Sequence, residues 1–190
     1  MSLDAVLLTH SHKDHIAGMD DLKAYNYFQQ RSMKVYADAP TENAIRREFY
    51  YAFADERYPG VPEFDVYRIP PDAFTVGDIT IMPITVWHLK MPVLGFRFGK
   101  FTYITDANFI EDAEKEKIKG SEVMVVNALR RQKHISHYNL EEAIDLVKEL
   151  NVPTGYLTHL SHQMGKHADV EKELPEGIHL GYDGLLLRFE

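Results

Sequence analysis

Cysteine is absent from this sequence of 190 residues, which excludes disulfide bonds and thiolate metal ligands within the chain. A continuous apolar run of about 18 residues is also lacking, so no membrane-spanning helix is predicted. The first residues show no basic region followed by an apolar stretch, which argues against a signal peptide. We therefore expect a cytoplasmic protein with no membrane partner.

Positive charge is scarce as well. The chain has 21 Lys and Arg against 29 Asp and Glu, which gives a formal net charge of −8. Proteins that bind nucleic acid generally neutralise its phosphates with surplus Lys and Arg, so we expect nucleic acid as a ligand only in the form of a short RNA or a nucleotide. A small phosphorylated substrate remains compatible with this charge, because a metal centre can hold it locally.

Apolar residues are plentiful, at 45% of the chain, and the length fits a single domain over residues 1–190. Segments with strand patterns alternate with helical ones and with hairpins. This order predicts a layered fold of the α+β or α/β class.

Individual elements can be predicted from local patterns. An imperfect helical period predicts one helix over residues 14–30, and a Pro near its start predicts another over 40–53. The spacing of Asn139 and Glu142 predicts a capping box at the start of a helix over 140–150. Short apolar runs between turn residues predict strands, among others at 33–37, 123–127, 154–158 and 185–189.

The ten histidines are concentrated in informative places. His10, His12, Asp14 and His15 lie where a predicted strand passes into a helix. Residues two apart in an extended segment point the same way, so His10 and His12 can share one ion, while Asp14 and His15 can turn toward a second. Imidazole and carboxylate ligands suit Zn, Mn or Fe. The alternative interpretation is a solvated, His-rich loop that caps a helix.

The segment from His10 to His15 resembles the HxHxDH motif of the metallo-β-lactamase superfamily without substitution. The resemblance implies an αββα sandwich and further ligands in a fixed order along the chain: His88, a bridging Asp106 and His159. It implies one metal site made by His10, His12 and His88, and a second made by Asp14, His15 and His159, with Asp106 shared. Taken singly, His88, Asp106 and His159 each have an ordinary structural alternative.

Two such ions would hold a bridging hydroxide, since the pKa of metal-bound water can fall toward about 7. That chemistry predicts metal-assisted hydrolysis. We expect two divalent ions, Zn or Mn, with Fe also open.

Three local segments are similar to the PhnP-type phosphodiesterases, relatives of ribonuclease Z. They begin at Gly18, Pro92 and Thr158. This resemblance implies a catalytic histidine upstream of His159. We assign that role to His137, as a general acid for the leaving alkoxide or as a group that stabilises the phosphorane oxygens, in preference to His134; a surface histidine is the alternative.

Two further assignments follow from the same resemblance. Asp14 is counted among the catalytic residues as well as among the metal ligands. In the family, the histidine that corresponds to His162 joins cysteines at a separate zinc site, and this chain has none. His162 is therefore predicted either to lack such partners or to contact His159.

Residues 40–63 concentrate arginines and aromatic side chains. They are predicted either to form a flap that holds a phosphate and stacks a base, or to form an amphipathic helix with aromatic side chains in the core and arginines in solvent.

The sequence begins in the strand just before the motif, whereas superfamily members usually carry several strands earlier. We therefore expect an N-terminally truncated domain, with exposed sheet edges that favour a homo-oligomer. The predicted function is hydrolysis of a small cyclic or nucleotide-type phosphodiester. The alternatives are a thioester or lactone hydrolase on the same fold and an inactive fragment.

Overall fold

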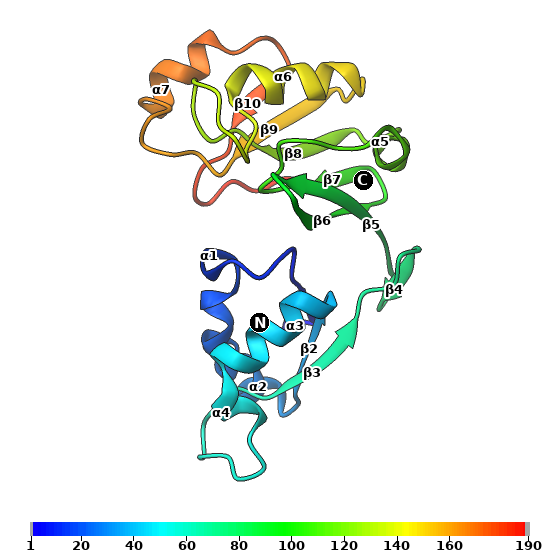
Figure 1. Cartoon of the computed structure of the whole chain (residues 1–190), viewed down its shortest axis with the longest axis vertical. Coiled ribbons are helices and arrows are strands. Elements are labelled where there is room, and N and C mark those ends of the chain that lie inside the picture. Colours follow the sequence, from blue (N-terminus) through cyan, green and yellow to red (C-terminus); the bar gives the residue numbers. More distant parts are fainter. Residues whose placement is uncertain (1, 189–190) are drawn as a thin grey trace. The chain divides into compact units, whose positions relative to one another are not determined.

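The computed structural model describes residues 2–188, and the chain divides into two compact units, residues 1–79 and 80–190. Each unit has its own hydrophobic core. We refer to them as unit 1 and unit 2, and Figure 1 shows the elements of each.

Unit 1 is built on a parallel sheet in the order β1-β2-β3. Its strands are β1 (Ala5–Leu7), β2 (Met33–Ala37) and β3 (Phe64–Arg68). Helical segments connect them, as parallel neighbours require a crossover. They are α1 (Lys13–Ile16), the 3-10 helix η1 (Ala17–Leu22), α2 (Lys23–Gln29), α3 (Ala39–Glu48) and α4 (Tyr50–Phe53). A short strand, β4 (Phe74–Val76), follows, and its Phe74 stacks on Tyr36 with ring centroids 5.4 Å apart.

The core of unit 1 lies between the sheet and its helices. Val35 and Ile45 are fully buried, from β2 and α3 respectively, and Phe49 is buried beside them. The side chain of Asp38 accepts a hydrogen bond from the Thr41 backbone N–H and so caps α3, which carries Pro in its first turn.

The prediction of one continuous helix over residues 14–30 is wrong. The backbone leaves helical geometry at Ile16 (φ −122°, ψ −14°), and a 3-10 helix separates α1 from α2. Helix α2 has no buried residue and ends at Gln30 with φ 52°. Ile16 and Met19 are buried and Leu22 and Tyr25 pack against the core, so the segment follows the core in three short helical pieces instead of one continuous helix. The predicted helix over 40–53 is likewise two helices, α3 and α4.

Unit 2 contains a mixed sheet in the order β10-β9-β8-β7-β6-β5. Strands β7 to β10 run parallel, whereas β5, β6 and β7 are antiparallel neighbours. The strands are β5 (Ile79–His88), β6 (Met91–Phe98), β7 (Phe101–Tyr103), β8 (Val123–Asn127), β9 (Thr154–Thr158) and β10 (Ile178–Leu180). The predicted strands at 123–127 and 154–158 are confirmed.

The helices of unit 2 cover one face of this sheet (Figure 1). They are α5 (Asp112–Ile118), α6 (Leu140–Glu149), α7 (His167–Val170) and the 3-10 helix η2 (Glu171–Glu173). Ile118, Val147 and Val170 pack from three of these helices into the core with Met124 and Leu157 of the sheet. Gly155 permits this close packing, because an added Cβ would lie 2.9 Å from Ile178 and 3.0 Å from Val147.

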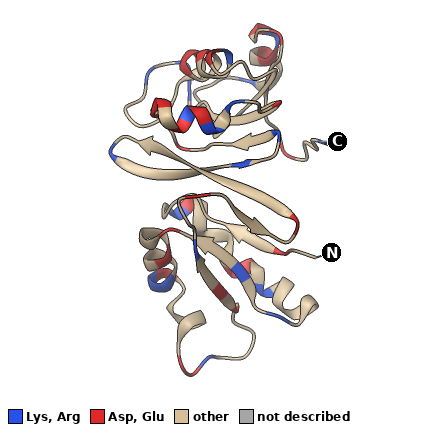
Figure 2. Cartoon of the chain, turned by 90° about the vertical axis from the view of Figure 1, so that its right-hand side faces the viewer, with Lys and Arg blue, Asp and Glu red and all other residues tan. Residues whose placement is uncertain are grey.

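The outer surfaces of the helices are charged. Figure 2 shows acidic and basic residues interspersed along α5, where Lys117 pairs with Glu114 at 2.8 Å. The predicted capping box opens α6: Asn139 accepts from the Glu142 backbone N–H at 2.8 Å, and the Glu142 carboxylate accepts from the Asn139 N–H at 3.0 Å. This prediction is confirmed.

The predicted strand over residues 185–189 is wrong. Residues 185–188 have no strand geometry, and Phe189 lies outside the described residues. Strand β10 lies earlier, at Ile178–Leu180, and pairs in parallel with β9. Its three residues are too short to produce an alternating pattern in the sequence, and the parallel partner is 20 or more positions away.

Among residues 2–188, no helix has the length and apolar character that a membrane crossing requires.

Candidate metal centre

In unit 1 the four predicted ligands of the first motif lie close together. His12 is the N-cap of α1, and Asp14 and His15 lie in that helix. The ring of His10 lies 4.7 Å from that of His12 and 4.2 Å from that of His15, between centroids. The Asp14 carboxylate is 3.3 Å from His15 Nε2. The strand-to-helix transition therefore gathers three imidazoles and a carboxylate within one short segment.

The orientation of His10 is set by its neighbour. Its Nδ1 is 3.0 Å from the Thr9 hydroxyl, and the side chain is almost fully buried. With Nδ1 engaged in this contact, Nε2 is the ring nitrogen that would serve as metal ligand. A hydrogen bond to the other ring nitrogen is a common feature of metal-binding histidines.

In unit 2 a second cluster is centred on Asp106, which follows β7 and is buried. Its Oδ1 accepts a hydrogen bond from the Thr105 hydroxyl at 2.8 Å and lies 3.1 Å from His159 Nε2. Its Oδ2 lies 3.5 Å from His137 Nε2. One ligand atom each from Asp106, His137 and His159 all fall within 4.8 Å of one another. Asp106 and His159 offer a carboxylate oxygen and an imidazole nitrogen, donors that suit a divalent metal ion, and the His137 ring lies beside them.

The backbone at this cluster is unusual. Asp106 and His159 adopt positive φ angles of 53° and 55°, a region that is uncommon for residues other than Gly and that Asn, Asp and His enter more often than the rest. Such conformations cost about 1–3 kcal/mol each and concentrate at functional sites. His159 directly follows β9, so the left-handed turn redirects the chain at the strand end.

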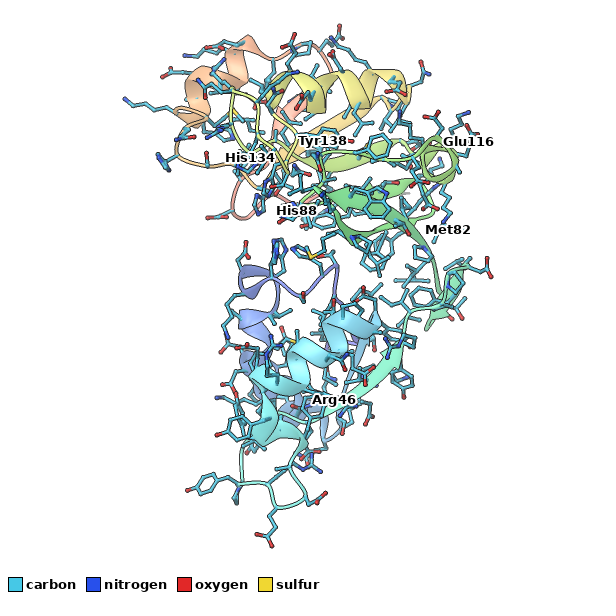
Figure 3. The ribbon with its side chains drawn as sticks, in the orientation of Figure 1. Arg46, Met82, His88, Glu116, His134 and Tyr138 are labelled. Carbon is cyan, nitrogen blue, oxygen red and sulfur yellow. The ribbon has the colours of Figure 1, made fainter. Side chains whose placement is uncertain are left out.

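His88, at the end of β5, is held by the loop that carries His137. Its Nδ1 donates to the Ser136 carbonyl oxygen at 2.8 Å, and its ring lies edge-on to that of His137 at 4.5 Å. Nε2 is again the nitrogen that would face a metal. Figure 3 shows His88 close to His134 and Tyr138.

His134 contacts His137 directly, with 3.1 Å between the two Nδ1 atoms. The Ser136 hydroxyl lies 3.3 Å from the first and 3.2 Å from the second. Burial, and then the charges of His137 and Arg130, lower the pKa of His134. The sequence favoured His137 over His134 and did not indicate Ser136 or Thr105. Serine and threonine are common residues, and their contacts here produce no recognisable sequence motif.

The remaining predicted residues lie elsewhere. His162 is exposed in the turn after β9, and its predicted contact with His159 stays a prediction. In the 40–63 segment, Arg46 pairs with Glu42 at 2.9 Å and lies 4.6 Å from the centre of the Phe53 ring, while Phe49 is buried in the core. These contacts are those of the amphipathic-helix alternative, and the flap stays a prediction.

Comparison with known proteins identifies the class. A family model described as a β-lactamase superfamily domain matches residues 1–160. The chain therefore belongs to the β-lactamase superfamily. The predicted relationship to metallo-β-lactamase-fold proteins and the predicted mixed α/β class are confirmed, and the class implies divalent metal ions.

Individual relatives show which branch is similar. The structure matches that of a diphosphatase from the PhnP family with a TM-score of 0.90 and 31% identity, covering 100% of this chain and 72% of that one. An octanoyltransferase of Porphyromonas gingivalis is 39% identical over 97% of this chain. An exodeoxyribonuclease of Streptococcus pneumoniae is 27% identical over 66% of it. The chain spans 37% and 44% of the lengths of these two relatives.

Proposed function

We propose that the chain is a metal-dependent phosphodiesterase that hydrolyses a small cyclic or nucleotide-type phosphodiester. The observation that carries this proposal is the buried Asp106 carboxylate of unit 2, which lies 3.1 Å from His159 Nε2 and 3.5 Å from His137 Nε2. The likeness to a PhnP-family diphosphatase and to an exodeoxyribonuclease supports phosphorus esters as substrates.

The proposed cofactors are two divalent ions, Zn or Mn. His10, His12 and His88 would hold one ion, Asp14, His15 and His159 the other, and Asp106 would bridge them. The donor chemistry fits, because each residue offers an imidazole nitrogen or a carboxylate oxygen. When bound, such ions polarise phosphoryl oxygens and lower the pKa of water to about 7.

The chain's own residues would orient the ligands and move a proton. Thr9 and Ser136 fix the ring orientations of His10 and His88. His137 presents Nε2 toward Asp106, while its Nδ1 is held by His134 and the Ser136 hydroxyl. A proton on His137 Nε2 would pass to the leaving alkoxide oxygen, the role of a general acid.

The test is hydrolysis of bis(p-nitrophenyl) phosphate by protein loaded with Mn or Zn, with metal content measured in parallel. We expect metal-dependent release of p-nitrophenol and loss of both activity and about one equivalent of metal in Asp106→Asn. A metal-loaded protein that leaves phosphodiesters intact would contradict the proposal. Binding of less than one equivalent, unchanged by His12→Ala, would instead support an inactive fragment.

A thioester hydrolase is the second candidate, favoured by one observation. The octanoyltransferase relative is named for an acyl group, although the chain matches only 37% of that protein. Octanoyl thioesters assayed for free thiol in the same preparations distinguish the two. Thioester hydrolysis without phosphodiester hydrolysis would favour the thioester hydrolase over the phosphodiesterase.

A further inference from the structure

Three large apolar side chains are exposed in unit 2 close to the candidate centre. Leu89 is 51% exposed, Phe109 54% and Ile135 72%. Single exposed apolar residues are ordinary on protein surfaces, but a group of them beside a site is informative. We call Leu89, Phe109 and Ile135 the apolar rim.

Asn108 is hydrogen-bonded to two residues of the apolar rim. Its Oδ1 accepts from the Leu89 backbone N–H at 2.7 Å, and its Nδ2 donates to the Ile135 carbonyl at 3.3 Å. Phe109 is the next residue, and its carbonyl accepts from the Trp87 N–H at 2.9 Å. The three side chains therefore belong to one hydrogen-bonded group of loops, although they are up to 46 positions apart in the sequence.

The same loops carry residues of the candidate centre. Leu89 directly follows His88, and Ile135 directly precedes Ser136, whose carbonyl accepts from His88 Nδ1. Ile135 is also two positions before His137. The rim is thus adjacent to the one predicted ligand on β5 and to the predicted proton donor.

The chemistry of the rim indicates what it would bind. Binding of a flat apolar group against exposed apolar side chains is favourable, because it removes apolar surface from water. Aromatic side chains such as Phe109 also stack on rings. The exposed Lys90 follows Leu89 directly and adds positive charge that attracts an anionic diester. Lys133, two positions before Ile135, is paired with Glu142 at 3.8 Å. A phosphodiester with an aromatic ester group combines both features.

We propose, resting on the phosphodiesterase function above, that the apolar rim binds an aromatic ring carried by one ester group of the substrate, such as the ring of an aryl ester or the base of a nucleoside ester. This group is the one retained on phosphorus. Leu89 and Phe109 are attached to the end of β5 that carries His88, and Ile135 lies on the loop of His137, which would protonate the group that leaves. On this proposal the rim selects diesters by the group that stays.

Two diesters with the same leaving group test this. Bis(p-nitrophenyl) phosphate and methyl p-nitrophenyl phosphate both release p-nitrophenol, but only the first retains an aromatic group. Their intrinsic reactivities differ, so wild type and variants are compared by a ratio. This ratio is kcat/KM for bis(p-nitrophenyl) phosphate divided by kcat/KM for methyl p-nitrophenyl phosphate. For Leu89→Ser/Phe109→Ser/Ile135→Ser we expect this ratio to fall about tenfold, as loss of one ring contact predicts, with most of the change in KM for the bis-aryl diester.

Leu186→Ser is the matched control, because Leu186 is as exposed as Ile135, at 72%, and should leave the ratio unchanged. If the triple variant does not fold, Phe109→Ser and Ile135→Ser singly should each lower the ratio about threefold. Cleavage of both diesters with an unchanged ratio in the rim variants would overturn this inference and leave the phosphodiesterase function standing. Cleavage of neither by metal-loaded wild type would overturn both.

Discussion

Asp106 brings together most of the candidate chemistry of unit 2. Its two carboxylate oxygens lie near His159 and His137, and the Thr105 hydroxyl fixes one of them. Because Asp106 is buried on a left-handed backbone, its carboxylate has little freedom to turn away. The ring of His137 is also stacked on that of His159, with centroids 5.1 Å apart, and this contact restricts its position.

Replacement of His137 by Ala should lower kcat by about 10²–10⁴, the range for loss of a general acid, while bound metal stays near the wild-type level. Steady-state kinetics on a phosphodiester and metal analysis measure the two quantities. His167→Ala is the control, because His167 is an exposed histidine of α7. Equal rates for His137→Ala and wild type would remove His137 from the mechanism and leave the metal ligands in place.

His134 should act through His137 rather than on substrate. Its Nδ1 contacts the Nδ1 of His137 at 3.1 Å and so favours one ring orientation. We expect His134→Leu to lower kcat about tenfold, as for other residues that orient a functional histidine, with KM unchanged. His134→Asn, which restores a polar contact, should recover part of the rate. A change confined to KM would contradict the positioning role.

Helix α6 helps to position the loop that carries His137. Its capping box begins at Asn139, two residues after His137, so the cap also fixes the end of the loop that carries the predicted proton donor. Tyr138 lies between them, and its N–H donates to the Ala107 carbonyl next to Asp106.

Removal of this cap should destabilise the fold. Asn139→Ala is expected to lower the free energy of unfolding by about 1–2 kcal/mol, because Asn139 is buried and the Glu142 N–H would lose its acceptor. Urea denaturation measures this. Glu141→Ala, an exposed change in the same helical turn, should have an effect below about 0.5 kcal/mol. Equal effects of the two changes would show that the cap contributes nothing specific.

Glu171, in the 3-10 helix η2, is hydrogen-bonded to His179 and Leu180 of β10. We therefore expect the stability of the fold to depend on pH. Burial alone would raise the pKa of Glu171, but hydrogen bonds from the Leu180 N–H and from His179 lower it below its ordinary value of 4.5. A lowered folded-state pKa stabilises the protein above pH 4.5, and this stabilisation is lost as the pH falls through the folded value.

Glu171→Gln should therefore unfold with a smaller acid dependence than wild type. At pH 7 the variant should be less stable by about 1–2 kcal/mol, the contribution of hydrogen bonds to a charged acceptor, and the difference should shrink as the pH falls below 4.5. Thermal denaturation from pH 3 to 7 measures it. A difference that stays constant over this pH range would exclude the charge of Glu171 as the cause.

At the scale of the whole molecule, the proposed metal ions should affect stability. Metal binding should then stabilise the folded chain, by about 2.7 kcal/mol when free metal is 100 times Kd. We expect addition of Zn or Mn to raise the Tm of wild type and a chelator to reverse the shift. His12→Ala in unit 1 and Asp106→Asn in unit 2 should each lose most of the shift, whereas His167→Ala should keep it. A shift that survives either change would remove the substituted residue from the proposed ligand set.

The sequence by itself predicted a ligand set and indicated the class, of which the class is confirmed. The HxHxDH spacing between His10 and His15 is local, so a strand followed by a helix is sufficient to bring those side chains together. Strands β2, β8 and β9 could also be predicted, because buried strands with clear turn residues carry a local signal. The same is true of the cap at Asn139, where both partners lie within one turn of helix.

Only the tertiary structure decided what surrounds those ligands. The contacts of His88 with Ser136 and of Asn108 with Leu89 and Ile135 join loops that are far apart in sequence, and no local pattern encodes them. The break between α1 and α2 and the pairing of β10 depend on which neighbours each segment buries. Residue types and spacing thus specify the metal chemistry, whereas long-range packing specifies the orientation of each ligand and the apolar rim beside it.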